Sequence, residues 1–293
     1  MSADMTGKVC LVTGANQGIG KETAAALARM GATVVMTSRD RAKGEAALAD
    51  VRSRSTGSAE LMLADFGSFA STRQFAADFK SRYERLDVLV NNAGAIITTR
   101  SETADGFETT FGVNHLGYFL LTNLLLDTIR SSAPARIVNV SSRAHLRSAM
   151  DFDDLNSRQG RYSAMTVYAR SKLANVLFTY ELARWLEGTG VTANCLHPGV
   201  VRTGFGKNNS GYAKLIFQTF QVVARPWILS PEKGAATSIY LASSPEVEGV
   251  TGKYFADCHE TPSSPASYDE DAQRRLWEVS EEMCGLKVGQ RHA

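Results

Sequence analysis

Short runs of β-branched and apolar residues alternate along this chain with segments of helical length. This alternation is typical of buried parallel strands that are joined by right-handed crossover helices. The pattern therefore predicts an α/β fold, in which a doubly wound, mostly parallel sheet carries helices on both faces. We expect strands at Lys8–Val12, Thr33–Thr37, Glu60–Leu63, Val88–Val90, Arg136–Val140 and Val191–Leu196.

One domain is enough to hold this pattern, because no linker, internal repeat or low-complexity tract divides the 293 residues. The first helix is expected at Ile19–Met30, with Gly31 as its C-terminal cap. Further helices are expected at 165–187 and 269–283. Within the domain 1–293 we assign the cofactor-binding core and the catalytic residues to 5–200, a substrate flap to 201–230, and the C-terminal helix, last strand and tail to 231–293.

Composition excludes several classes of partner. The 32 basic and 30 acidic residues leave a net charge of +2, which predicts no nucleic-acid partner. No stretch reaches the roughly 20 apolar residues that cross a bilayer, and the N-terminus lacks the apolar run of a signal peptide. We therefore expect a cytoplasmic protein.

The cysteines lack the close spacing of a metal site, and we expect them to be free thiols. They are Cys10, Cys195, Cys258 and Cys284.

A glycine-rich segment, TGANQGIG at 13–20, joins the first strand to the first helix. At such a junction a glycine turn lets a pyrophosphate approach backbone amides at the positive end of a helix. A tight turn without a ligand is the alternative, but the position in a βαβ unit favours a dinucleotide. The candidate contacts are Gly14, Asn16, Gln17, Gly18, Ile19 and Gly20.

The end of the second strand indicates which dinucleotide is bound. Ser38 stands where a carboxylate would accept hydrogen bonds from a free ribose 2′-hydroxyl, and Arg39 follows it. The forked guanidinium of arginine suits a 2′-phosphate. The alternative is that Arg39 pairs with Asp40 on the surface. We predict NADP(H) as the cofactor.

Tyr168 and Lys172 lie four residues apart in the helix expected at 165–187, so both side chains lie on one face of it. A lysine cation and a positively charged nicotinamide could bring the tyrosine pKa from near 10 to about 7 or 8. On its own this spacing is common on solvated helices. Ser141 and Ser142 add to it, because they follow a central strand at its carboxyl end, where ligands of open α/β sheets bind.

The sequence contains the patterns TGxxxGxG, NNAG, YxxxK and PG, in that order and spread over almost the whole chain. In this it resembles the short-chain dehydrogenase/reductase family. The resemblance implies a Rossmann fold and a catalytic tetrad of Asn114, Ser142, Tyr168 and Lys172. It also implies cofactor contacts from Asp65, Phe66, Asn92, Ala93, Gly94, Tyr168, Lys172, Pro198, Gly199 and Thr203.

The family spacing to Tyr168 selects Ser142 over Ser141 as the catalytic serine. We expect Asn139 and Ser141 to bond only to the backbone, and His115 and His197 to be structural. The resemblance implies that Ser142 and Tyr168 bind a carbonyl oxygen, that NADPH delivers hydride, and that Tyr168 donates the proton. Lys172 would lower the tyrosine pKa, and Asn114 would position a relay water. No metal is expected.

Within the family the chain resembles the retinol dehydrogenase-like members, through the segments 103–108, 112–117, 171–175, 257–259 and 275–277. Several members carry a membrane-anchoring helix ahead of the first strand, which this sequence does not show. Related proteins often form homodimers through helices at the positions of 116–129 and 165–186, and a homodimer is one expectation here.

Apolar residues at helical spacing between 205 and 229 predict a flap over the active site, with 208–211 as its hinge; an ordinary helix on the core is the alternative. A flap would favour a lipophilic carbonyl or alcohol substrate, such as a retinoid, a steroid, or a fatty or aromatic aldehyde. Other hypotheses are a non-catalytic NADP(H)-binding sensor or scaffold, an NADPH-dependent reductase of ring double bonds, and an enzyme that contacts membranes through the flap. The apolar flap residues are Tyr212, Leu215, Ile216, Phe217, Phe220, Val223 and Trp227.

Overall fold

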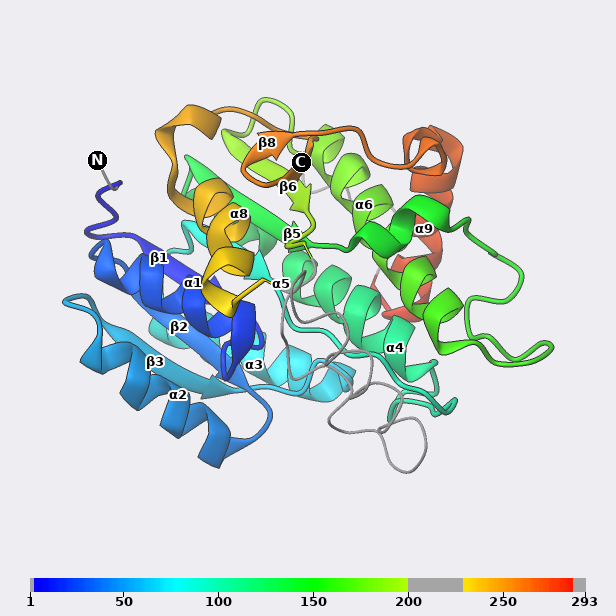
Figure 1. Ribbon diagram of the computed structural model, residues 1–293, viewed down its shortest axis with the longest axis horizontal. Coiled ribbons are helices and arrows are strands. Elements are labelled where there is room, and N and C mark those ends of the chain that lie inside the picture. The colour runs from blue at the N-terminus through cyan, green and yellow to red at the C-terminus, as the bar shows by residue number, and fades with distance from the viewer. Residues whose placement is uncertain (1–2, 200–228, 287–293) are drawn as a thin grey trace.

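The computed structural model describes residues 3–199 and 229–286, which form an eight-stranded sheet with helices on both faces (Figure 1). The strand order is β3-β2-β1-β4-β5-β6-β7-β8, and every neighbouring pair is parallel except β7 and β8. The predicted doubly wound, mostly parallel sheet is confirmed. The strands are β1 Val9–Val12, β2 Thr33–Ser38, β3 Ala59–Leu63, β4 Val88–Asn91, β5 Ala135–Val140, β6 Val191–Leu196, β7 Tyr254–Ala256 and β8 His259–Glu260.

Two apolar layers enclose the sheet, because successive side chains of a strand point to opposite faces. Leu11 and Leu89 belong to the layer under α3, α5 and α6, whereas Val12 and Val90 belong to the layer under α1, α2 and α8. The longer helices are α1 Gly18–Arg29, α2 Arg41–Ser53, α3 Phe69–Arg82, α5 Gly117–Ser131, α6 Ala164–Trp185, α8 Pro231–Ser243 and α9 Glu270–Met283. Shorter turns are α4 Thr109–Phe111, η1 Gly112–Leu116, η2 Arg143–Arg147, η4 Pro245–Val247 and η5 Pro265–Tyr268.

The boundaries of the expected helices follow from their caps. The first helix ends one residue before Met30, and Gly31 follows with a φ of +94°. Helix α6 begins after Ser163, whose hydroxyl accepts a hydrogen bond from Thr166 N. Helix α9 begins after Asp269, which caps it in the same way. The six expected strands are all present, and the sequence did not locate the two short strands that follow them, β7 and β8.

The last helix packs against α6 (Figure 1), and its Trp277 also reaches α5. Trp277 of α9 is 4% exposed, packs edge-on against Phe119 of α5, and stacks on Trp185 of α6 with 4.6 Å between ring centroids. Part of the surface that was expected to form a homodimer is therefore occupied by the chain's own α9. Among the described residues, no helix combines the length and the apolar character that a membrane span requires.

Candidate active site

In the turn between β1 and α1, the main chain packs closely against itself and against the main chain of the segment that follows β4. Gly14 and Gly18 have φ values of +62° and +59°, in the left-handed region that favours glycine. A Cβ on Gly14 would lie 2.8 Å from Ala93 Cα, and one on Gly20 would lie 2.6 Å from Gly14 O. The first turn of α1 carries no acidic residue, and Gln17 before it makes no capping hydrogen bond. The turn thus fits a phosphate bound to the free amides at the start of α1.

The segment after β4 locks this turn in place. Thr13 Oγ1 accepts hydrogen bonds from the backbone N of Asn92 at 2.8 Å and of Ala93 at 2.9 Å. The Asn92 side chain donates in return to Thr13 O at 2.8 Å. The predicted contacts from the first and fourth strands are therefore brought together at the point where the strand order reverses, where open α/β sheets bind ligands.

Arg39 does not form the surface pair with Asp40 that was its alternative role. The Asp40 carboxylate accepts from Lys43 N at 3.0 Å and pairs with Lys43 Nζ at 3.2 Å, and these hydrogen bonds lower its pKa. The Ser38 hydroxyl is buried and turned onto the backbone of Asp40. Within the described part of the chain Arg39 has no ion pair, and it is exposed at the end of β2. Its guanidinium is available to a ligand.

Asp65 and Phe66, two further predicted cofactor contacts, differ in how exposed their side chains are. Asp65 is exposed and its Oδ1 accepts from Gly67 N at 2.9 Å. Phe66 is 6% exposed, and its ring packs edge-on against Phe75 in the core. Only the backbone of Phe66 is therefore positioned to contact a cofactor.

Tyr168, Lys172 and Ser142 meet at the carboxyl end of β5. Lys172 is 3% exposed, its Nζ donates to Val140 O at 2.9 Å and lies 5.9 Å from the centroid of the Tyr168 ring. Burial raises the pKa of the Tyr168 phenol, and its hydrogen bond with Ser142 acts in the opposite direction. Burial also lowers the pKa of Lys172 to about 8. In the protein without cofactor, the burial of the phenol outweighs its contact with Ser142. The expected lowering of the Tyr168 pKa includes the charge of a bound nicotinamide and stays a prediction.

Asn114 lies in η1, a single turn of π-helix, a feature common at functional sites. Its two amide protons are donated to Ala95 O at 2.9 Å and to Ser171 Oγ at 3.0 Å, while its Oδ1 accepts from Ala95 N. The side chain thus joins the loop after β4 to α6. Both amide protons are used, so on this side chain only Oδ1 can accept a hydrogen bond from the expected relay water.

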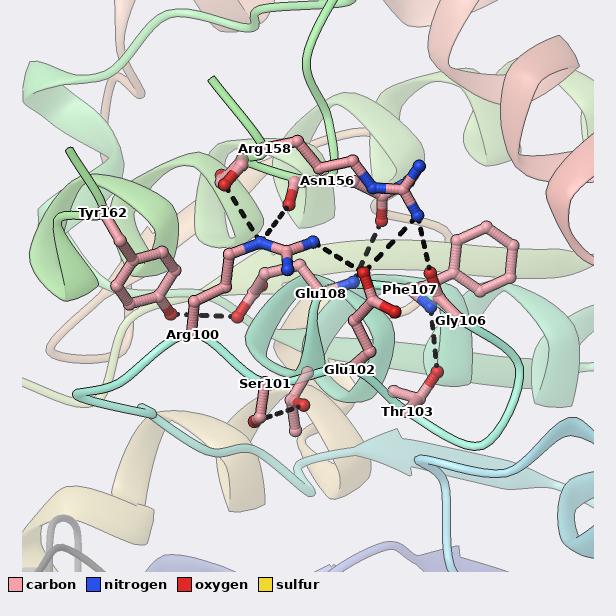
Figure 2. A network of polar contacts seen from close by, with 12 residues as sticks. Arg100, Ser101, Glu102, Thr103, Gly106, Phe107, Glu108, Asn156, Arg158 and Tyr162 are labelled. Carbon is pink, nitrogen blue, oxygen red and sulfur yellow. Dashed lines mark hydrogen bonds and ion pairs between the residues drawn. The ribbon is translucent and has the colours of Figure 1, made fainter. Parts of the chain in front are cut away.

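A buried carboxylate ties the helix of Asn114 to the helix of Tyr168 (Figure 2). Glu108 is fully buried and caps α4, which leads into η1, by accepting from the backbone N of Thr110 and Phe111. It also accepts from Tyr162 Oη at 2.9 Å, just before the start of α6. The backbone N of Glu108 donates to Asn156 Oδ1 at 2.9 Å. The segment 103–108, which the sequence suggested only as a family signature, therefore has a structural role at the site.

The sequence did not indicate His145, which contacts the backbone of Ser142, the predicted catalytic serine. It is fully buried, and its Nε2 accepts from Ser264 N at 3.2 Å. Nδ1 therefore carries the proton and donates to Ser142 O at 2.6 Å. Tyr254 Oη lies 3.4 Å from this nitrogen and 3.1 Å from His197 Nδ1. Burial lowers the pKa of His145, and that of His197 to about 4. Only the nearness of His145 to Ser142 in the sequence could have suggested it.

The prediction for the polar residues near Ser142 was partly wrong. Ser141 Oγ donates to Lys172 O at 2.7 Å, as expected for a backbone contact. Asn139 instead bonds to side chains: it accepts from Asn91 Nδ2 at 2.8 Å and donates to Thr179 Oγ1 at 2.9 Å. These partners come from the neighbouring strand and from α6, which a local pattern cannot reveal. His115, fully buried against Ser280 Oγ at 2.8 Å, is part of the core as predicted.

The loop after β6 contributes Pro198 and Gly199 to the same edge of the sheet. Gly199 has a φ of +76°, and a Cβ there would meet Leu229 Cδ1 at 2.7 Å. Thr203 and the predicted hinge and flap residues up to 228 lie outside the described residues. No cluster of potential metal ligands occurs in the ranges 3–199 and 229–286.

Comparison with known proteins gives matches over nearly the full chain. A family model for short chain dehydrogenases matches residues 8–212. Human retinol dehydrogenase 14 is 50% identical over 296 residues, which cover 96% of this chain and 88% of the human protein. Human retinol dehydrogenase 12 is 46% identical over 287 residues, with coverage of 98% and 89%.

Solved structures share the fold. A protein from Mycobacterium paratuberculosis superposes with a TM-score of 0.79 at 34% identity and covers 97% of this chain and 96% of its own. The RhlG/NADP active-site complex of Pseudomonas aeruginosa has a TM-score of 0.68 at 28% identity, with coverage of 87% and 96%.

Proposed function

Because this chain belongs to the short chain dehydrogenase family, whose members are NAD(P)(H)-using oxidoreductases that act on CH–OH groups, we propose that it interconverts a lipophilic aldehyde or ketone and its alcohol with NADP(H). One observation carries the proposal. The Tyr168 phenol bonds to Ser142 beside the buried Lys172, at the edge of the sheet that also holds the phosphate-binding turn. Substrate and dinucleotide would meet there.

The residues of the chain handle the proton in this reaction. Ser142 and Tyr168 hold the substrate oxygen, and Tyr168 donates its proton as the carbonyl becomes an alcohol. Burial raises the pKa of Tyr168, so the phenol is protonated at neutral pH and ready to donate. The Lys172 ammonium, held on Val140 O, stabilises the phenolate that remains. When bound, the nicotinamide supplies the hydride in reduction and accepts it in oxidation.

The preference for NADP(H) rests on the end of β2. The exposed Arg39 has no ion pair in the described part of the chain, and no carboxylate replaces Ser38 to bind a free 2′-hydroxyl. A forked guanidinium at this position favours the 2′-phosphate. The RhlG complex, a structural relative, is described as binding NADP.

A lipophilic substrate is supported by the two elements that present the catalytic groups. Met165 lies one turn before Tyr168 in α6 and is 59% exposed, and Leu146, in η2 after Ser142, is 43% exposed. Large apolar side chains that are exposed on the elements carrying the catalytic groups suit an apolar ligand with one polar end. Two of the most similar proteins are named retinol dehydrogenases, which makes retinal and retinol the first substrates to test. The cytoplasmic location stays a prediction.

The test is a series of straight-chain aldehydes of increasing length, together with retinal, measured with NADPH and with NADH. We expect kcat/KM to rise about fourfold for each methylene group that is buried. Met165→Ser should flatten this dependence and leave the shortest aldehyde unaffected. A kcat/KM that does not depend on chain length would contradict the lipophilic assignment. Binding of NADPH without turnover of any carbonyl would favour the sensor or scaffold hypothesis.

A further inference from the structure

Lys172 lies between two tyrosine rings, of which only one belongs to the predicted catalytic group. Its Nζ is 5.9 Å from the centroid of the Tyr168 ring and 5.6 Å from that of the Tyr118 ring. Tyr118 is the second residue of α5 and is 1% exposed. Two different helices therefore each place an aromatic ring beside the same buried ammonium group.

The surroundings of Lys172 offer little else to stabilise its charge. Its Nζ donates one hydrogen bond to Val140 O of β5, and the titratable groups around it are Tyr168 on its own helix, Tyr118 on α5 and Cys195 on β6. The Cys195 thiol is neutral, because burial raises its pKa to about 12. Among the described residues no carboxylate forms an ion pair with Lys172. A buried ammonium group that has no carboxylate partner is stabilised by the electron-rich face of an aromatic ring.

The hydroxyl of Tyr118 does not explain why a tyrosine stands here. Its Oη is buried and has no hydrogen-bond partner within the described part of the chain. Burial raises the pKa of this phenol far above its ordinary value, so it carries no negative charge that could attract the ammonium. The ring is therefore the part of Tyr118 that interacts with Lys172.

We propose that Tyr118 is a positioning residue whose ring holds the charged form of Lys172 beside Tyr168. The proposal rests on the proposed function, because it assigns Lys172 a role in stabilising the phenolate. The Tyr118 ring is buried in α5, and burial strengthens the electrostatic contact between the ring and the ammonium group. Tyr118 thus stabilises the charged form of Lys172, which is buried in the fold.

The test measures the ionisation of Lys172 directly in the protein without cofactor or substrate. The ¹³Cε and attached proton signals of isotopically labelled lysine are followed between pH 6 and pH 11, and the Lys172 signal is identified by its absence from a Lys172→Met variant. Tyr118→Leu removes the ring and should lower the Lys172 pKa by about one unit. Tyr118→Phe keeps the ring and is the matched control, so its titration should coincide with that of the unchanged protein.

A second ringless variant, Tyr118→Met, replaces Tyr118→Leu if the latter does not fold. In the reduction assay the alkaline loss of kcat should move to lower pH by the same amount in the ringless variants and stay in place in Tyr118→Phe. An unchanged Lys172 titration in the ringless variants, or an equal shift in Tyr118→Phe, would overturn the proposal. Because the titration needs no turnover, it stands even if the proposed reaction fails its own test.

Discussion

The phosphate-binding turn and the catalytic group lie at the same edge of the sheet but are held by different kinds of contact. In the turn, main-chain atoms lie against each other, and the glycines at 14, 18 and 20 allow their close approach. In the catalytic group, side chains are held by other side chains and by distant backbone, as in the contacts of Asn114 with Ser171 and of His145 with Ser264.

Because of this difference, we expect the turn to determine cofactor binding and the catalytic group to determine the rate of the reaction. The turn offers amides to any phosphate, and we propose that Arg39, which is exposed at the end of β2, distinguishes NADP(H) from NAD(H). The catalytic group depends on the placement of three side chains to within a fraction of an ångström, since misplacement slows chemistry more than binding. Changes in the first region should therefore alter cofactor affinity and choice, and changes in the second should alter kcat.

Arg39→Asp tests the first half of this comparison and should have the larger effect. It removes a charge-assisted contact with the 2′-phosphate and adds a repulsive charge, so kcat/KM for NADPH should fall about a hundredfold while that for NADH rises. Arg41→Asp is the matched control, because Arg41 is an exposed arginine of α2 that pairs with Glu45. An unchanged ratio of the two kcat/KM values in Arg39→Asp would show that Arg39 does not contact the cofactor.

Substitution of His145 tests the second half. His145→Gln places no donor where Nδ1 now meets Ser142 O, so kcat should fall about tenfold while KM for NADPH stays constant. His145→Asn is the matched variant, because its amide can occupy the position of Nδ1 and should retain more of the kcat. Equal losses in both variants, or a loss confined to the KM for NADPH, would contradict a role in holding Ser142.

The two regions also differ in how far they could be predicted from the sequence. The glycine turn, the Gly31 cap and the spacing of Tyr168 and Lys172 are local patterns, and the structure places all of them as expected. The support of the catalytic group escaped prediction because its partners are far apart along the chain. Glu108 and Tyr162 are 54 residues apart, and His145 and Ser264 are 119 apart.

Local patterns also suggested partners that the structure replaces with others. An ion pair between Arg39 and Asp40 was only the alternative to a cofactor contact of Arg39, and it does not form, because Asp40 caps α2 and pairs with Lys43. Asn139 was expected to bond to the backbone, but its neighbours across the sheet and on α6 supply side-chain partners. Burial raises the pKa of Tyr168 in the protein without cofactor, and the helical spacing of Tyr168 and Lys172 does not indicate this burial. The lowered pKa expected with a bound nicotinamide stays a prediction.

The central claim is that Tyr168 is the proton donor, and Tyr168→Phe tests it most directly, with NADPH affinity and single-turnover reduction measured on the same preparation. Phenylalanine keeps the ring and removes only the acid, so the rate should fall by about two to four orders of magnitude. The Kd for NADPH should stay within about twofold, since the lost hydroxyl bonds to Ser142 and not to the phosphate-binding turn. A rate within about tenfold of the unchanged protein, with NADPH bound normally, would contradict the assignment.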